Sequence, residues 1–120
     1  MTPNQFPLLK TQEEFETLLC PPNGNKEDYS PLVIIYFTAD WCGACKRIDW
    51  SKIQPEKHTG ITWLLCDVDL NDYTPGYCGV KGIPAFQALI YGKHEPLFQS
   101  NSADDILTWL RILVEKVNRQ

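Results

Sequence analysis

One strand-to-turn sequence decides the fold of this chain: Tyr36-Phe37-Thr38-Ala39-Asp40-Trp41-Cys42-Gly43-Ala44-Cys45-Lys46. It ends an apolar run over 32–37, carries two cysteines three positions apart, and precedes a helical pattern. Residues i and i+3 of a helix have Cβ atoms about 5–6 Å apart, and a disulfide needs about 3.8 Å. A small backbone adjustment would therefore let Cys42 and Cys45 form and break a disulfide. A helix start there would also stabilise a thiolate on Cys42 and lower its pKa from the free value of about 8.5.

Two other roles for this cysteine pair are weighed. One Cys-x-x-Cys supplies two of the four ligands that a structural zinc needs. The remaining cysteines and histidines stand singly, without the spacing of a zinc signature: Cys20, Cys66, Cys78, His58 and His94. The second role is that of a small core residue. It suits Cys20, as a half-buried filler, and Cys66, as a buried one, but not two cysteines that flank Gly43-Ala44 at a strand-to-helix turn.

Two segments resemble the thioredoxin family. The first is Trp41-Cys42-Gly43-Ala44-Cys45-Lys46 after a hydrophobic strand, and the second is Val80-Lys81-Gly82-Ile83-Pro84-Ala85-Phe86. The resemblance spans nearly all of the 120 residues. It implies one domain over 1–120 with an α/β fold, a thioredoxin-like three-layer sandwich in which a mixed five-stranded sheet has helices on both faces. It also implies that the Ile83–Pro84 bond is cis and that Pro84 faces the cysteine pair.

The composition narrows the function and the compartment. The chain has 11 basic and 15 acidic residues and a net charge of −4, which disfavours binding to nucleic acid or to an anionic membrane. No apolar run reaches the roughly 18 residues of a membrane span, and the N-terminal sequence does not look like a signal peptide. Five cysteines cannot all pair with one another, so a secreted disulfide framework is not expected. We therefore expect a reducing, cytoplasmic location.

Periodicity and turn signals place the remaining elements. The expected strands cover 6–10, 32–37, 61–69, 85–91 and 95–100. Three helices are expected. The first begins at a capping box formed by Thr11 and Glu14 and ends at Cys20. The second covers 42–54, and the third begins at a cap on Ser102. The family has a short helix at 71–78, where Pro75 and Gly76 predict a broken one. The long loop over 21–31 is expected to be a solvated insertion rather than a partner-binding element.

The resemblance implies dithiol–disulfide exchange, with reduction of protein disulfides. Cys42, expected to be the more exposed cysteine, would attack a substrate disulfide. Cys45 would then resolve the mixed disulfide and leave Cys42–Cys45 oxidised. Five residues would frame the substrate surface: Trp41, Gly43, Ala44, Ile83 and Pro84. No metal and no cofactor beyond the cysteine pair is implied.

The implied partners are disulfide-containing proteins, with thioredoxin reductase or a glutathione system as the reductant. A monomer is expected, and a disulfide-linked dimer stays open through Cys78, which has a possible regulatory role. Two alternatives remain. One is a thioredoxin-fold binding module with little redox turnover, and the other is a dimer bridged by a metal or cluster at the cysteine pair.

Five positions depart from the family pattern. Ala44 replaces a proline, which leaves an N–H free to face the Cys42 sulfur and predicts a less negative reduction potential. Tyr36 and Leu65 replace the buried aspartate and lysine of the family's proton relay, for which Asp67, Asp40 or a water could substitute. Two further replacements affect shape. Trp50 stands at the helix-kinking proline and predicts a straighter helix, and Ser100 near the groove glycine predicts a narrower groove.

Overall fold

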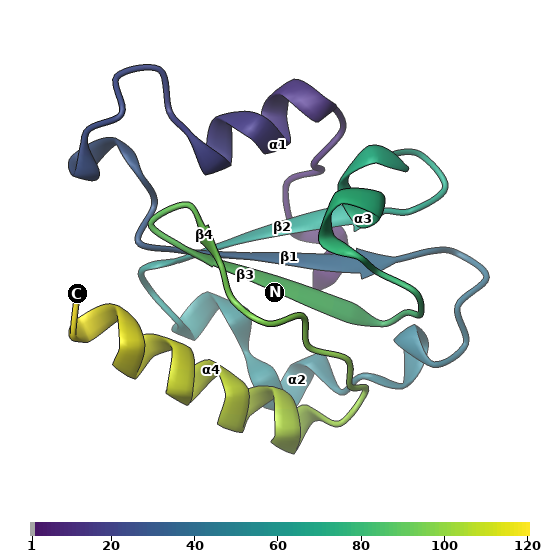
Figure 1. The fold of residues 1–120 in the computed structure, drawn as a ribbon. Coiled ribbons are helices and arrows are strands. Elements are labelled where there is room, and N and C mark those ends of the chain that lie inside the picture. The colour runs from purple at the N-terminus through teal and green to yellow at the C-terminus, as the bar shows by residue number, and fades with distance from the viewer. Residues whose placement is uncertain (1) are drawn as a thin grey trace.

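The structure is a computed structural model that describes residues 2–120, and it has three layers (Figure 1). The strands are β1 (Leu32–Thr38), β2 (Ile61–Asp67), β3 (Ala85–Ile90) and β4 (Lys93–His94). The helices are α1 (Gln12–Leu19), α2 (Trp50–Ile53), α3 (Tyr73–Cys78) and α4 (Ala103–Asn118). Over the described residues the strands form one mixed sheet in the order β2-β1-β3-β4. Helices α1 and α3 cover one face of the sheet, and α2 and α4 cover the other (Figure 1). The predicted α/β sandwich is confirmed.

Strand β1 lies inside the sheet, as its apolar sequence predicted. It pairs in parallel with β2 and antiparallel with β3. Its side chains alternate between two buried clusters, because successive residues of a strand point to opposite faces. Ile34 and Tyr36 belong to the cluster under α2 and α4, which also contains both cysteines of the pair. Strand β1 therefore carries the chain directly from the core to the cysteine turn.

The sheet does not have the predicted five strands. The strand predicted over 6–10 is wrong, because this segment forms a single parallel bridge between Leu8 and Leu65. Two hydrogen bonds hold it: Leu9 N–H donates to Leu65 O at 2.8 Å, and Leu65 N–H donates to Pro7 O at 2.9 Å. Pro7 has no N–H to extend the ladder. This part of the chain is consequently a short edge contact on β2 rather than a strand.

The strand predicted over 95–100 is also wrong. It is reduced to an antiparallel bridge between Phe98 and Phe86, and β4 lies earlier, directly after the turn. Pro96 cannot donate to β3, and the side-chain amide of Gln87 donates to Glu95 O at 2.7 Å. The Gln87 side chain thus binds a backbone carbonyl that would pair with a backbone N–H in a longer strand.

The cysteine helix predicted over 42–54 is broken into a 3-10 turn, Cys45–Arg47, and the short helix α2. Ile48 between them is extended, with ψ 124°, and Asp49 caps α2 by accepting the N–H of Ser51 at 3.1 Å. The straighter helix predicted from Trp50 is therefore wrong. Trp50 starts α2 and packs inward on Tyr36, with ring centroids 5.1 Å apart.

The other helices follow their cap signals. Thr11 and Glu14 form the predicted capping box of α1, and Ser102 caps α4 by accepting the N–H of Asp105 at 3.3 Å. The break predicted at Pro75 is wrong, because this proline lies in the first turn of α3, where the N–H groups have no partner inside the helix. Cys20, predicted to be half-buried, is exposed at the end of α1.

Candidate active site

The two cysteines of the pair form a disulfide, with Cα atoms 5.3 Å apart. Cys42 N–H donates to Ala39 O at 3.1 Å, which closes the turn that follows β1. Cys42 is 4% exposed and Cys45 is 5% exposed. The expectation that Cys42 is the more exposed cysteine is therefore wrong for this oxidised form. The pair lies at the edge of the buried cluster on the α2 and α4 face of the sheet.

The N–H that meets the Cys42 sulfur comes from Cys45, at 3.1 Å. This donor is one residue beyond Ala44, whose N–H the sequence analysis expected in that place. The expected long helix and its dipole are absent behind Cys42, because only a 3-10 turn follows before Ile48 breaks the backbone. Local N–H donation, rather than a helix macrodipole, is therefore what favours a thiolate on Cys42.

An apolar groove lies beside the pair and is lined by Trp41, Val68, Pro75, Val80, Lys81, Gly82 and Ile83, with a volume of about 450 Å³. The Ile83–Pro84 bond is cis, as the resemblance implied. Ile83 and Ala44 pack against the cluster that contains both cysteines. Trp41 and Ile83 therefore line the same groove, and Ala44 lies between the two cysteines, while Pro84 is buried and Gly43 is exposed.

Trp41 lines this groove and is 67% exposed, and its indole N–H donates to Asp69 Oδ2 at 2.9 Å. Asp69 was not predicted as a site residue, because nothing in the local sequence pattern links the end of β2 with the cysteine turn. Ser100 uses its hydroxyl to accept the N–H of Ser102 at 3.0 Å, in the turn that leads into α4.

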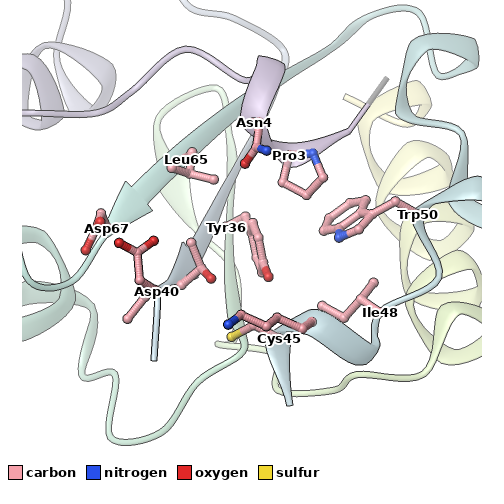
Figure 2. A pocket seen from close by; sticks show the side chains of 12 residues that line it. Pro3, Asn4, Tyr36, Asp40, Cys45, Ile48, Trp50, Leu65 and Asp67 are labelled. Atoms are coloured by element: carbon pink, nitrogen blue, oxygen red, sulfur yellow. The ribbon is translucent and has the colours of Figure 1, made fainter. Parts of the chain in front are cut away.

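A second cavity, of about 260 Å³, is lined by Cys45 (Figure 2). Tyr36 and Leu65 line it from neighbouring strands, in direct register, at the two positions that depart from the family pattern. Burial raises the pKa of the Tyr36 hydroxyl, and a hydrogen bond with the Thr38 side chain opposes this shift. Tyr36 is therefore neutral at physiological pH.

The three other cysteines are free thiols. Burial raises the pKa of the Cys66 thiol to about 12 and that of the Cys78 thiol to about 12. Cys66 is a fully buried core residue, as predicted. Cys78 is half-buried, and its sulfur lies 3.9 Å from Nε2 of His94. Burial disfavours the reactive thiolate of Cys78, and its regulatory role stays a prediction.

Over residues 2–120, no three His, Cys, Asp or Glu side chains gather where they could hold a metal ion. None of the helices described there has the length and apolar character needed to cross a membrane.

Comparisons with known proteins place this site in a family. The thioredoxin family model matches residues 8–111. The chain is 34% identical over 86 residues to thioredoxin of Geodia cydonium, covering 71% of this chain and 76% of that protein. It is 31% identical over 84 residues to human thioredoxin, covering 69% of this chain and 80% of that protein.

Solved structures show the same fold. Fasciola hepatica thioredoxin superposes with a TM-score of 0.70 at 24% identity, over 95% of this chain and 98% of that chain. Oxidised mitochondrial thioredoxin 3 of Saccharomyces cerevisiae superposes with a TM-score of 0.75 at 19% identity, over 90% and 95%.

The fold and the cysteine pair define a protein thiol–disulfide oxidoreductase. The chain belongs to the thioredoxin family. The disulfide between Cys42 and Cys45 favours this function over a binding module without redox turnover.

Proposed function

We propose that this protein reduces disulfides in partner proteins, with Cys42 as the attacking cysteine and Cys45 as the resolving one. The observation that carries the proposal is the Cys42–Cys45 disulfide beside an apolar groove that holds the exposed Trp41. The N–H of Cys45 donates to the Cys42 sulfur, which favours negative charge on Cys42. Trp41, Gly43, Ala44, Ile83 and Pro84 form the substrate surface in this proposal.

In the first step the Cys42 thiolate attacks one sulfur of a substrate disulfide. A Cys42–substrate bond forms, and the other substrate sulfur leaves with the electron pair and takes up a proton. Cys45 then loses its proton and attacks the Cys42 sulfur. The Cys42–Cys45 bond forms, the Cys42–substrate bond breaks, and the second substrate sulfur leaves as a thiolate. Two electrons thus pass from the cysteine pair to the substrate.

The protein would be returned to its reduced form by thioredoxin reductase, with a glutathione system as the alternative reductant. The thioredoxin family is reduced by thioredoxin reductase, and the match of this chain to that family supports the first choice. The odd number of cysteines argues against a secreted disulfide framework and supports a cytoplasmic location in this proposal. Incubation with NADPH and either thioredoxin reductase or glutathione with glutathione reductase would separate the two reductants by the rate of NADPH consumption.

Trapping tests the cysteine roles. Cys45→Ser would accumulate mixed disulfides on Cys42 when mixed with a disulfide-containing protein, because the resolving thiol is missing. Cys42→Ser would accumulate none, or far fewer, and serves as the matched control. Peptide mapping under non-reducing conditions identifies the cysteine that is linked. Equal trapping by both variants, or trapping through Cys78, would contradict the proposal.

A further inference from the structure

The resolving step needs a place for the proton of Cys45. In the reduced protein its thiol must become a thiolate before it can attack Cys42, and the residue is 5% exposed. The strand positions beneath it, Tyr36 and Leu65, carry no carboxylate and no amine. A proton acceptor for Cys45 therefore has to come from elsewhere in the cavity that they line.

The next residue pair along the same strands supplies one. Thr38 of β1 pairs with Asp67 of β2, two residues beyond Tyr36 and Leu65 in the parallel register. Because strand side chains alternate, both pairs point to the same face of the sheet. All four residues line the cavity that reaches Cys45. The carboxylate thus lies one residue pair nearer to the cysteine turn, at the C-terminal ends of the strands.

Figure 2 shows how these groups are arranged around the cavity. The hydroxyl of Tyr36 points toward Cys45, and Asp67 and Asp40 lie together at the far side from Trp50. The Thr38 side chain is hydrogen-bonded to Tyr36. The cavity also has room for water. The hydroxyl groups of Tyr36 and Thr38 and the carboxylate of Asp67 therefore line the same cavity as Cys45, and this cavity can hold bridging water.

We propose that the Tyr36 hydroxyl and the Asp67 carboxylate form the proton relay of Cys45. Tyr36 passes the thiol proton on, and Asp67 accepts it. This inference rests on the proposed function, because it concerns the step in which Cys45 resolves a mixed disulfide. The family pattern has an acid at the Tyr36 position. In this relay the acid is Asp67, which pairs with Thr38, two residues further along β1.

Asp67 is better placed than the neighbouring Asp40. It is the last residue of β2 and half-buried, and its Oδ1 accepts the N–H of Asp69 at 2.9 Å, which fixes the carboxylate. Asp40 is exposed in the loop after β1. The charged side chains that line the cavity from its surrounding elements are Asp40, Lys46 and Asp67, and the test compares the two carboxylates, because a carboxylate can accept a proton.

The Cys45 proton moves to Tyr36 Oη while the Tyr36 proton moves toward Asp67, so Tyr36 stays neutral and Asp67 becomes a carboxylic acid. The Cys45 sulfur then attacks Cys42, and the substrate sulfur leaves with its electron pair. Asp67 returns the proton to solvent or to the departing thiolate. No further oxidant or reductant is needed.

Stopped-flow reduction of dithiobis-nitrobenzoate separates the two steps. Each reduced protein releases one thionitrobenzoate when Cys42 attacks and a second when Cys45 resolves. The Cys20→Ser background removes the exposed free thiol. The variants are Tyr36→Phe, Asp67→Asn, their combination and Asp40→Asn. Asp28→Asn, in the exposed loop over 21–31, controls for the loss of one charge.

We expect Tyr36→Phe and Asp67→Asn each to slow the second release by about 10²-fold, with the first release unchanged. The combination should be no slower than the slower single variant, because both groups serve one path. In these variants the second release should rise about tenfold per pH unit, as hydroxide takes over removal of the proton. A purely structural defect would not produce this pH dependence.

Wild-type rates of second release in both single variants would overturn the relay, as would additive losses in the combination. An effect of Asp40→Asn as large as that of Asp67→Asn would overturn the assignment to Asp67. If Tyr36→Phe does not fold by circular dichroism, the pH profile of Asp67→Asn decides. Absence of the first release from the wild-type protein would instead refute the proposed function, and the relay with it.

Discussion

The indole N–H of Trp41 donates a hydrogen bond to Asp69 Oδ2 at 2.9 Å, across 28 residues of sequence. Trp41 precedes the attacking cysteine, and Asp69 follows the end of β2. Because β1 and β2 are parallel, their C-terminal ends meet at one edge of the sheet. This contact fixes the large exposed ring of Trp41 over the groove beside the disulfide. It therefore links the end of β2 to the substrate surface of the proposed function.

Asp69→Ala should weaken docking of protein substrates without slowing the chemistry of Cys42. The loss of one hydrogen bond of about 0.5–1.5 kcal/mol corresponds to a KM that is about two- to tenfold higher. The KM and kcat for a protein disulfide, compared with the rate on dithiobis-nitrobenzoate, provide the measurement. Asp72→Ala, an exposed aspartate on the next turn, is the matched control. A changed rate on the small disulfide would contradict this role.

Ala44→Pro should change the reduction potential by less than about 10 mV. Ala44 has φ −64°, which proline adopts without strain, so the turn should keep its shape. The N–H that meets the Cys42 sulfur belongs to Cys45, so loss of the Ala44 N–H leaves this stabilisation of the thiolate in place. Redox titration in dithiothreitol buffers, with alkylated thiols counted by mass spectrometry, gives the potential. Ala44→Ser keeps the N–H and is the matched control, and a potential that is more negative by about 30 mV or more with proline but not with serine would contradict the assignment of the donor to Cys45.

The free cysteines should differ sharply in reactivity. Cys20 is exposed, whereas burial raises the pKa of both Cys66 and Cys78 to about 12. Iodoacetamide at about pH 8 should label Cys20 within minutes and leave Cys66 and Cys78 unlabelled until urea unfolds the protein, because only the thiolate reacts. Peptide mapping by mass spectrometry checks each site. Rapid labelling of Cys78 in the folded protein would revive its regulatory role.

The same two thiols should lower stability at alkaline pH. Their folded pKa values of about 12 lie above an unfolded value of about 8.5. Between these values the unfolded chain binds fewer protons than the folded one, so the free energy of unfolding falls as pH rises. Urea unfolding at about pH 8 and pH 10 measures this slope. Cys66→Ala with Cys78→Ala should flatten it, and an unchanged slope would assign it to other groups.

Substitution of two isoleucines on α4 can show which side of this helix packs against the core. Ile106 is fully buried against the sheet, whereas Ile112 is 50% exposed. Ile106→Ala should lower the free energy of unfolding by about 2–5 kcal/mol, because it removes buried methyl groups and leaves a cavity. Ile112→Ala should change it by less than about 0.5 kcal/mol. Urea unfolding with an unchanged m-value measures both, and similar losses would contradict the burial assigned to the helix.

Local patterns in the sequence determined much of this protein. The run over 32–37 predicted the interior strand β1, and the residue pairs Thr11–Glu14 and Ser102–Asp105 predicted the starts of α1 and α4. The Cys42–Cys45 spacing predicted the disulfide. These features depend on residues within a few positions of one another, where side-chain period, caps and short loops act directly.

Only the tertiary structure decided how many strands the sheet has and where the cysteine helix breaks. The local sequence of the segments 6–10 and 95–100 predicts strands. Pro7 and Pro96 cannot donate a backbone hydrogen bond, and each segment forms one bridge, to β2 and to β3 respectively. The contact of Trp41 with Asp69, and the cavity that joins Tyr36 to Asp67, likewise depend on the register of β1 on β2. Such contacts join residues far apart in the chain, so they are set by packing and strand pairing rather than by local sequence.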